Sequence, residues 1–156
     1  MGILPDFMIR DLAPNDRPVV VPFYERTVQN GMSFGLSSAG YDVRTKQGII
    51  LSPGQFILLS TVEHFWMPDD VIAFVHDKST WARRGIAVQN TVIEPGWRGY
   101  LTLEVTNHGD LIVEISAGDP IAQIVFHRME APAERRYDGK YQDQADAPVP
   151  AIREAC

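Results

Sequence analysis

The alternation of apolar and polar positions along this chain is that of a β protein. It is clearest from Tyr100 to Asn107, where positions 101, 103 and 105 are apolar and positions 102, 104 and 106 are polar. Successive side chains of a strand point to opposite faces, so this stretch predicts a strand with one buried and one polar face. Shorter apolar or β-branched runs predict further strands at residues 19–21, 55–62, 71–76, 111–116 and 121–126. Many short strands at close spacing, divided by turn signals such as 117–120, predict an all-β fold of the sandwich or barrel type.

Helical and irregular segments complete this outline. Residues 1–16 form an arm with one expected helical turn at 7–12, and a second brief helix is expected at 80–84. From about residue 131 the chain becomes polar and rich in proline and alanine. We therefore expect a β domain over residues 1–130 that includes the arm, followed by a tail at 131–156 that is ordered only where something docks it.

Composition limits the possible functions. The chain has 156 residues, of which 45% are hydrophobic and 22% charged, as expected for one globular domain with a real core. The formal net charge of −6 argues against a broad nucleic-acid-binding surface, although a few local cations suffice for a nucleotide. The single cysteine, Cys156, excludes an internal disulfide and a four-thiolate zinc site. We expect no membrane association and a cytoplasmic location, because no apolar run approaches a membrane span and no signal sequence is recognisable.

Ser79, Thr80 and Arg83 are the first candidates for chemistry. Hydroxyl groups that follow a strand can bind phosphate where a helix begins, and Arg83 lies one helical turn beyond Ser79. A helix cap followed by a solvated arginine would explain the same pattern.

Two carboxylates are further candidates. Glu104 lies in the middle of the alternating strand, where it is either a solvated strand residue or part of a cleft made with another subunit. A carboxylate in a dry cleft has a raised pKa and can carry protons. Glu94 precedes Pro95-Gly96 and is either a turn carboxylate, a hydrogen-bond acceptor for a sugar hydroxyl or a base for a water.

Several common site signatures are absent from the sequence. The four histidines have no metal-ligand spacing, and the zinc deaminase signature His-x-Glu followed by Pro-Cys-x-x-Cys does not occur. Neither a GxGxxG motif nor a P-loop is present. We therefore expect no metal site built from protein ligands.

Five motifs together resemble the dCTP deaminase branch of the dUTPase-like superfamily, over residues 39–144. They are Lys78-Ser79-Thr80-x-Ala82-Arg83-x-Gly85, Glu94-Pro95-Gly96-Trp97-x-Gly99, Leu101-Thr102-Leu103-Glu104 followed by Asn107, Gly118-Asp119-x-Ile121-Ala122-Gln123, and Tyr137 with Gly139-Lys140-Tyr141-Gln142-x-Gln144.

The resemblance implies a homotrimer of β-rich subunits with a distorted jelly-roll or β-clip fold and with active sites at the subunit interfaces. It also implies hydrolytic deamination of dCTP at C4 to dUTP and ammonia. In this family the triphosphate is accompanied by Mg²⁺ and zinc takes no part.

The same resemblance assigns roles by position. Glu104 would carry protons between water, N3 and the leaving amine, while Ser79 and Arg83 would hold the water and stabilise the tetrahedral intermediate. The remaining candidates would bind substrate. Lys78, Thr80 and Gln123 would bind the phosphates, and Glu94 would bind the 3′-hydroxyl. The carbonyl near Asn90 would orient the water, and Trp97 belongs to the motif that follows Glu94. Tyr137, Lys140 and Gln144 would bind the triphosphate as the tail closes.

Two alternatives remain open. The chain could be a dUTPase, or a bifunctional enzyme that carries dCTP through to dUMP and pyrophosphate, with Glu94 activating a water in place of the usual Asp. It could also be a nucleotide-binding regulator without turnover. Asn90 stands where relatives often have Ala or Val, so a cytosine substituted at C5 is a conceivable substrate.

Overall fold

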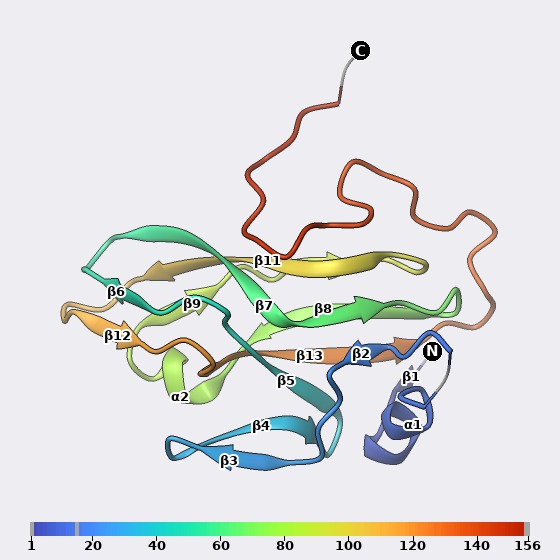
Figure 1. Ribbon diagram of the computed structural model, residues 1–156, viewed down its shortest axis with the longest axis horizontal. Helices are drawn as coiled ribbons and strands as arrows, with labels where there is room; N and C mark the ends of the chain where they lie inside the picture. The colour runs from blue at the N-terminus through green and yellow to red at the C-terminus, as the bar shows by residue number, and fades with distance from the viewer. Residues whose placement is uncertain (1, 15, 155–156) are drawn as a thin grey trace.

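The computed structural model describes residues 2–14 and 16–154, and most of its regular structure is β-sheet (Figure 1). In chain order the elements are β1 (Gly2–Ile3), α1 (Asp6–Asp11), β2 (Val20–Val21), β3 (Thr27–Gln29), β4 (Met32–Ser37), β5 (Gly40–Arg44), β6 (Ile49–Leu51), β7 (Phe56–Trp66), β8 (Val71–Asp77), α2 (Ser79–Ala82), β9 (Ile86–Val88), β10 (Val92–Ile93), β11 (Arg98–Asn107), β12 (Val113–Ile115) and β13 (Pro120–Arg128).

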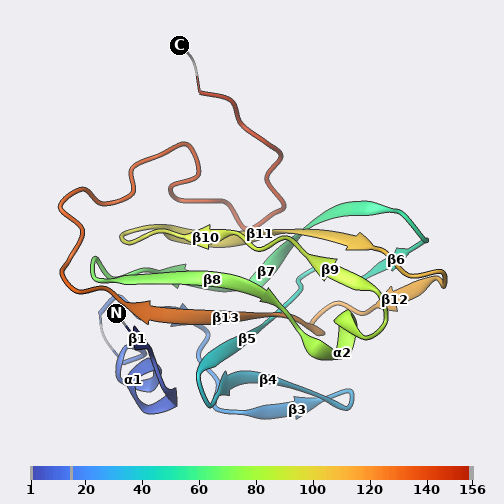
Figure 2. The same cartoon turned by 180° about the vertical axis from the view of Figure 1, so that it is seen from behind.

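The strands form three sheets. A seven-stranded sheet has the order β10-β8-β13-β5-β4-β3 with β1 added to β13, and a four-stranded sheet has the order β2-β7-β11-β9. Strands β6 and β12 form a small third sheet. Figures 1 and 2 show β11 and the upper part of β7 in a layer above β8 and β13, with the chain beyond β13 on the outer side of β11.

The core lies between these layers. Leu103 and Val105 of β11 and Ile124 and Phe126 of β13 are fully buried. Burying one such side chain contributes about 1.5–3 kcal/mol, so both strands are held firmly on their inner faces. This fixes β11 as a rigid carrier for the side chains on its outer face.

Most of the expected elements are present, with shifted ends. The structure has α1 at Asp6–Asp11 and α2 at Ser79–Ala82, close to the helical turns expected at 7–12 and 80–84. The strand expected at 55–62 extends to Trp66, and the one expected at 111–116 shortens to Val113–Ile115. The all-β prediction is confirmed.

No sequence pattern predicts the antiparallel unit of β3, β4 and β5. Gly35 interrupts the apolar pattern of β4, and it is needed there because its φ is +85° and a Cβ would lie 2.6 Å from the carbonyl oxygen of Glu25. Glycine is therefore required at position 35 by the close packing of residues 24–25 of the same chain, which no local sequence pattern shows.

The apolar positions expected in β11 are buried, Leu101 included, but the ladder is irregular beside Leu101. The pairing of β11 with β7 shifts register between Tyr100 and Thr102, and the Leu101 amide donates to the Thr61 hydroxyl instead of a ladder carbonyl. A bulge of this kind re-aims side chains. Leu101 consequently lines the same pocket as Thr102 and Glu104.

The chain beyond β13 docks on the domain. The amides of Tyr137 and Asp143 donate to the carbonyls of Pro95 and Arg98, and the Tyr100 amide donates to the carbonyl of Gln144. Gly99 permits the closest approach, since a Cβ there would lie 2.6 Å from the Gln144 nitrogen. Within the described residues, no helix is both long and apolar enough to cross a membrane.

Candidate active site

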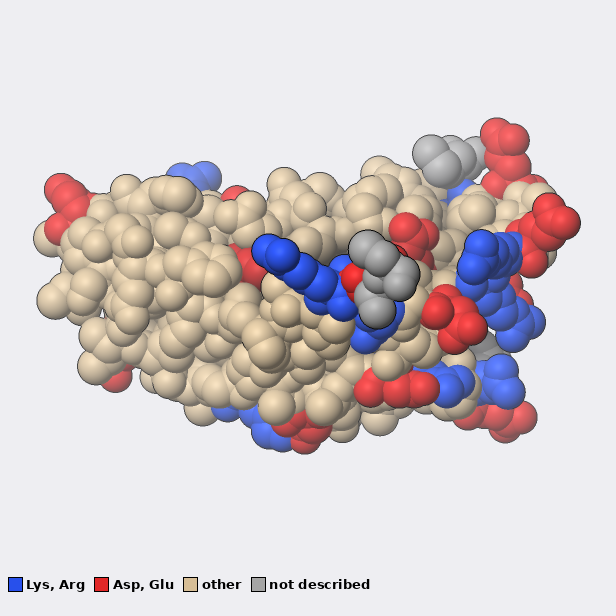
Figure 3. Space-filling view, turned by 90° about the horizontal axis from the view of Figure 1, so that it is seen from above, with Lys and Arg blue, Asp and Glu red and all other residues tan. Residues whose placement is uncertain are grey.

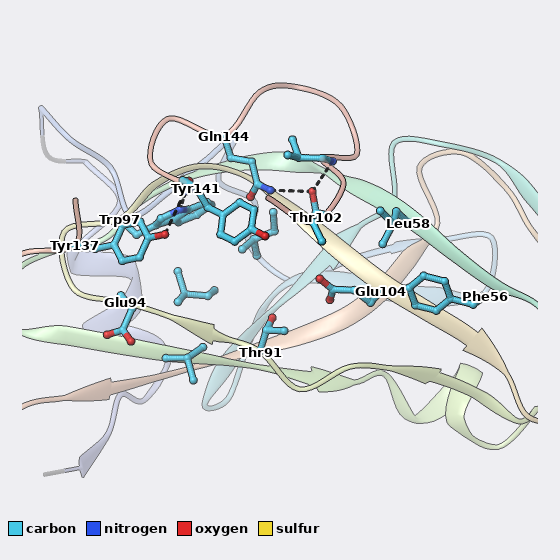
Figure 4. Close-up of a pocket in the computed structure, with 15 residues that line it drawn as sticks. Phe56, Leu58, Thr91, Glu94, Trp97, Thr102, Glu104, Tyr137, Tyr141 and Gln144 are labelled. Carbon is cyan, nitrogen blue, oxygen red and sulfur yellow. Dashed lines mark hydrogen bonds between the residues drawn. The ribbon is translucent and has the colours of Figure 1, made fainter. Parts of the chain in front are cut away.

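A pocket of about 590 Å³ lies between the outer face of β11, the β9–β10 segment and the tail (Figure 4). Its lining combines apolar walls with a few polar groups: Phe56, Leu58, Thr91, Val92, Ile93, Glu94, Trp97, Leu101, Thr102, Glu104, Tyr137, Tyr141, Gln144, Val149 and Ala151. Few polar groups in a largely apolar cavity are typical of a small-molecule site.

Glu104 is the most unusual group in the pocket. Glu104 lies opposite Leu58 in the β11–β7 ladder. On the other edge of β11, its backbone carbonyl accepts a hydrogen bond from the Gln89 amide at 3.0 Å, so the strand is held from both sides at this residue. Its Oε2 is buried and has no hydrogen-bond partner among the described residues. Burial raises the pKa of this carboxyl above its ordinary value. A buried carboxylate oxygen without a partner lowers the stability of the fold. Groups of this kind with a shifted pKa are concentrated at functional sites, where they can exchange protons with a ligand.

Thr102 lies two residues before Glu104 on the same outer face of β11. Its hydroxyl oxygen accepts hydrogen bonds from Gln144 Nε2 at 3.0 Å and from the Val149 amide at 2.9 Å. Figure 4 shows these two bonds reaching from the tail down to the strand. The tail is thereby attached to the strand that carries the candidate proton carrier.

The other end of the pocket is built by the β10–β11 turn and the tail. Trp97 is buried, and its indole Nε1 donates to the Tyr141 carbonyl at 2.6 Å. The Tyr141 amide donates to the Tyr137 hydroxyl at 3.2 Å, so the two tyrosines brace each other. Glu94 lines the pocket from an exposed position in the turn. Five of the predicted site residues therefore share one pocket: Glu94, Trp97, Glu104, Tyr137 and Gln144.

A second group of predicted residues lies elsewhere on the chain. Ser79, Thr80 and Arg83 are exposed on and just after α2, and none of them lines the pocket around Glu104. Helix α2 follows the end of β8, beside the far end of β11, where the His108 amide donates to the Gly85 carbonyl. One protomer alone does not bring Ser79 and Arg83 into the pocket.

Lys78 and Gln123 belong to this second group. Lys78 Nζ donates to Asp42 Oδ2 at 2.7 Å, and both side chains are buried. Gln123 pairs with Asp42 across β13 and β5 and donates to the Ser37 hydroxyl at 3.2 Å. Burial raises the pKa of Asp42 and outweighs the opposing effect of Lys78. In this structure the Lys78 ammonium is therefore paired with the Asp42 carboxyl group and is not free to contact a ligand.

The last two predicted residues lie outside the pocket lining. Asn90 is exposed in the segment that leads to Thr91, and the Lys140 ammonium lies 5.3 Å from the centre of the Tyr141 ring.

Sequence reasoning missed several lining residues: Phe56, Leu58, Thr91, Tyr141, Val149 and Ala151. Val92, Ile93, Leu101 and Thr102 line the pocket too and were not predicted either. Of all these residues only Leu101, Thr102 and Tyr141 stood within recognised motifs, so only these three had a usable sequence signal.

Metal ligands do not cluster in the described part of the chain. Residues 2–14 and 16–154 contain no group of three or more His, Cys, Asp or Glu side chains placed to hold a metal ion. Mg²⁺ bound through substrate phosphates needs only one or two carboxylates from the protein, so a cluster of three is not required for it.

The surface around the pocket is uneven in charge. Viewed from the tail side, Figure 3 shows charged side chains gathered toward the end where the tail leaves β13, whereas the opposite end, over β6 and β12, is largely uncharged. Four exposed apolar side chains lie on or next to these strands, namely Ile50 in β6, Phe56 at the start of β7, and Leu111 and Ile112 just before β12. Phe56 also lines the pocket and is 56% exposed, as is typical of a surface that another chain covers.

Comparison with known proteins agrees with the motifs. The family described as dCTP deaminase-like matches residues 39–129. The dCTP deaminase of Wolbachia sp. subsp. Brugia malayi is 36% identical, with 98% of this chain and 100% of that protein covered. The dCTP deaminase of Campylobacter curvus is 35% identical, with 97% and 99% covered.

Solved structures with a similar fold include dUTPases. The native EIAV dUTPase aligns with a TM-score of 0.57 at 17% identity, covering 80% of this chain and 95% of that one. A mutant dUTPase from phage phi11 of S. aureus, described as coordinating a structural Mg(II) ion, aligns with a TM-score of 0.55 at 15% identity, covering 76% and 92%. At these identities the likeness concerns the fold alone.

Proposed function

This chain belongs to the dCTP deaminase family, and we propose that it hydrolyses dCTP to dUTP and ammonia in the pocket around Glu104. The observation that carries the proposal is the half-buried Glu104 carboxylate in a largely apolar pocket, with its Oε2 atom buried and without a hydrogen-bond partner among the described residues. Deamination needs a group that removes a proton from water and returns protons to the leaving amine. The choice of dCTP as substrate rests on family membership, and the role of Glu104 as proton carrier is supported by its environment in the pocket.

The proposed chemistry uses one water and forms no covalent bond between the substrate and the protein. Glu104 takes a proton from the water as its oxygen bonds to C4 of cytosine, and N3 is protonated to give a tetrahedral intermediate. The proton of the new C4 hydroxyl then passes through Glu104 to the amino group, the C4–N bond breaks, and ammonia leaves as C4 becomes the carbonyl of uracil. Ser79 and Arg83 would hold the water and stabilise the charge that develops on the intermediate.

The separation of the two residue groups supports a site shared between protomers. Glu104 lines the pocket, whereas Ser79 and Arg83 are exposed beside α2 and do not line it. A homotrimer in which α2 of one protomer covers the pocket of the next would unite them. Phe56 and Val92, exposed apolar residues at the pocket mouth, would then be buried.

Substrate binding is proposed for the remaining predicted residues. Glu94 would accept the 3′-hydroxyl, Trp97 would shape the pocket beside it, and the backbone near Asn90 would orient the water. Lys78, Thr80 and Gln123 would contact phosphates, for which the Lys78–Asp42 pair would have to loosen. Tyr137, Lys140 and Gln144 belong to a proposed lid formed by residues 131–156.

Mg²⁺ is proposed to enter with the triphosphate, as part of the substrate complex. It would neutralise phosphate charge, while the proton transfers at the ring would depend on Glu104. We propose that zinc takes no part, and a test is activity in the presence of excess Mg²⁺ and a zinc-selective chelator. Loss of turnover that added zinc restores would contradict this proposal.

The function is tested by incubating the protein with dCTP and Mg²⁺ and resolving ammonia, dUTP, dUMP and pyrophosphate. The proposal expects equal amounts of ammonia and dUTP, with Glu104→Gln as the matched inactive control. Formation of dUMP and pyrophosphate would instead indicate the bifunctional enzyme, and tight nucleotide binding without any product would indicate a regulator. Either result would overturn the proposal.

A further inference from the structure

The tail is joined to β11 at several points, including backbone hydrogen bonds at Arg98 and Tyr100. The contact next to Glu104 along the strand is made by the Thr102 hydroxyl. The hydroxyl oxygen accepts both the Gln144 side-chain amide, at 3.0 Å, and the Val149 backbone amide, at 2.9 Å. A hydroxyl oxygen has two lone pairs, so the tail uses the full acceptor capacity of this residue. The Thr102 side chain is also buried, which makes the loss of either bond costly.

The contact between Thr102 and the tail lies next to Glu104 on β11. Thr102 and Glu104 are two residues apart, so they face the same side of the strand and line the same pocket. On the tail side, Val149 and Ala151 line this pocket too (Figure 4). The hydroxyl therefore helps to hold residues 144–149 against the cavity that contains Glu104. The flanking tail residues have contacts of their own, an ion pair between Lys46 and Asp146 and a hydrogen bond from the Ile152 amide to the Tyr141 hydroxyl.

We infer that Thr102 is a positioning residue, whose hydroxyl clasps the tail closed over the pocket and so retains the nucleotide beside Glu104. This inference rests on the proposed function for its catalytic consequence, but not for the clasp itself. Thr102 itself transfers no proton and acts through the tail. Its effect should therefore fall on substrate retention rather than on the chemical step.

Three substitutions separate the hydroxyl from the shape of the side chain. Thr102→Val keeps the branched shape and removes the acceptor, leaving Gln144 and the Val149 amide without this partner. Thr102→Ser keeps the hydroxyl and should behave like the unsubstituted protein. Thr106→Val is the matched control, because Thr106 lies on the same face of β11 two residues beyond Glu104 and, within the described chain, makes no hydrogen bond to the tail.

The clasp is measured first without substrate, by hydrogen–deuterium exchange of the tail peptide that contains Val149. Thr102→Val should speed exchange about tenfold, equivalent to about 1.4 kcal/mol and within the range expected for two lost hydrogen bonds. Thr102→Ser and Thr106→Val should stay within about twofold of the parent. Unchanged exchange in Thr102→Val, or equal acceleration in Thr106→Val, would overturn the clasp.

Steady-state kinetics with dCTP then test the consequence. Thr102→Val should raise KM about tenfold while kcat changes less than about threefold, and Thr102→Ser should restore KM. A fall in kcat with unchanged KM would refute the retention role. If the parent protein does not deaminate dCTP although exchange depends on Thr102, the proposed function fails and the clasp stands.

Discussion

Replacing Glu104 with glutamine preserves the shape of the side chain and removes its charge and its proton-carrying ability. General acid–base catalysis by a positioned side chain contributes about 10²–10⁴-fold, so kcat for deamination should fall by at least about a hundredfold. The affinity for dCTP should stay within about tenfold, because the walls of the pocket and the tail contacts are unchanged.

The same substitution should stabilise the fold. Glu104 Oε2 is buried without a partner among the described residues, and an unsatisfied buried polar atom costs about 1–3 kcal/mol. Glutamine keeps a polar atom at this position but removes the charge, which carries the larger burial cost, so the free energy of unfolding should rise by about 1 kcal/mol at neutral pH, or the melting temperature by about 2–4 °C.

The pH dependence of this gain has a fixed sign. Burial raises the pKa of Glu104 in the folded state, so the folded protein binds this proton more tightly than the unfolded chain does. Stability is therefore lost as pH rises from the unfolded pKa through the raised folded pKa. The advantage of Glu104→Gln should be small in acid and largest above that window.

The assay pairs urea unfolding of both proteins across this pH range with turnover of dCTP and equilibrium binding of the nucleotide. Glu104→Ala serves as a control for side-chain volume. A Glu104→Gln protein that retains deamination, or whose relative stability falls with rising pH, would refute the reasoning.

One substitution and one deletion test other parts of the structure. Lys78→Met should destabilise the protein by about 3–5 kcal/mol, because it leaves the Asp42 carboxylate buried without its ion-pair partner. The lost free energy of unfolding, measured with urea, should be largely recovered in the double variant with Asp42→Asn. A lack of recovery would contradict the view that the unpaired Asp42 carboxylate causes the loss. Deleting residues 136–156 should weaken dCTP binding more than tenfold while lowering the melting temperature by only a few degrees, since Tyr137 is the main tail residue packed on the core. Collapse of the domain without ligand would show that the tail is part of the core instead.

The elements that the sequence predicted well are those that carry their own periodicity. β11 was visible from its alternation and β13 from its apolar run, because each has a face buried in the core. β9 and β10 are only three and two residues long and have too few positions for a pattern. Their pairing partners, far along the chain, decide that they are strands.

The candidate site shows the same division. Glu94, Trp97 and Glu104 could be grouped from motif spacing, and all three line one pocket. Phe56 and Val149 could not, because they enter the pocket from chain segments with no chemical signature. The bulge before Thr102 was also invisible, since it depends on the Thr61 hydroxyl from a neighbouring strand.

The measurement that tests the shared site most directly is complementation between two inactive variants. Glu104→Gln and Arg83→Ala are unfolded together, refolded as a mixture and checked by native mass spectrometry for mixed assemblies. If each site takes Glu104 from one protomer and Arg83 from its neighbour, about one site in four regains both groups, and about a quarter of the parent activity should return. Mixing Glu104→Gln with Glu104→Ala should restore nothing. Verified mixed assemblies of the first pair that remain inactive would contradict a site built from two protomers.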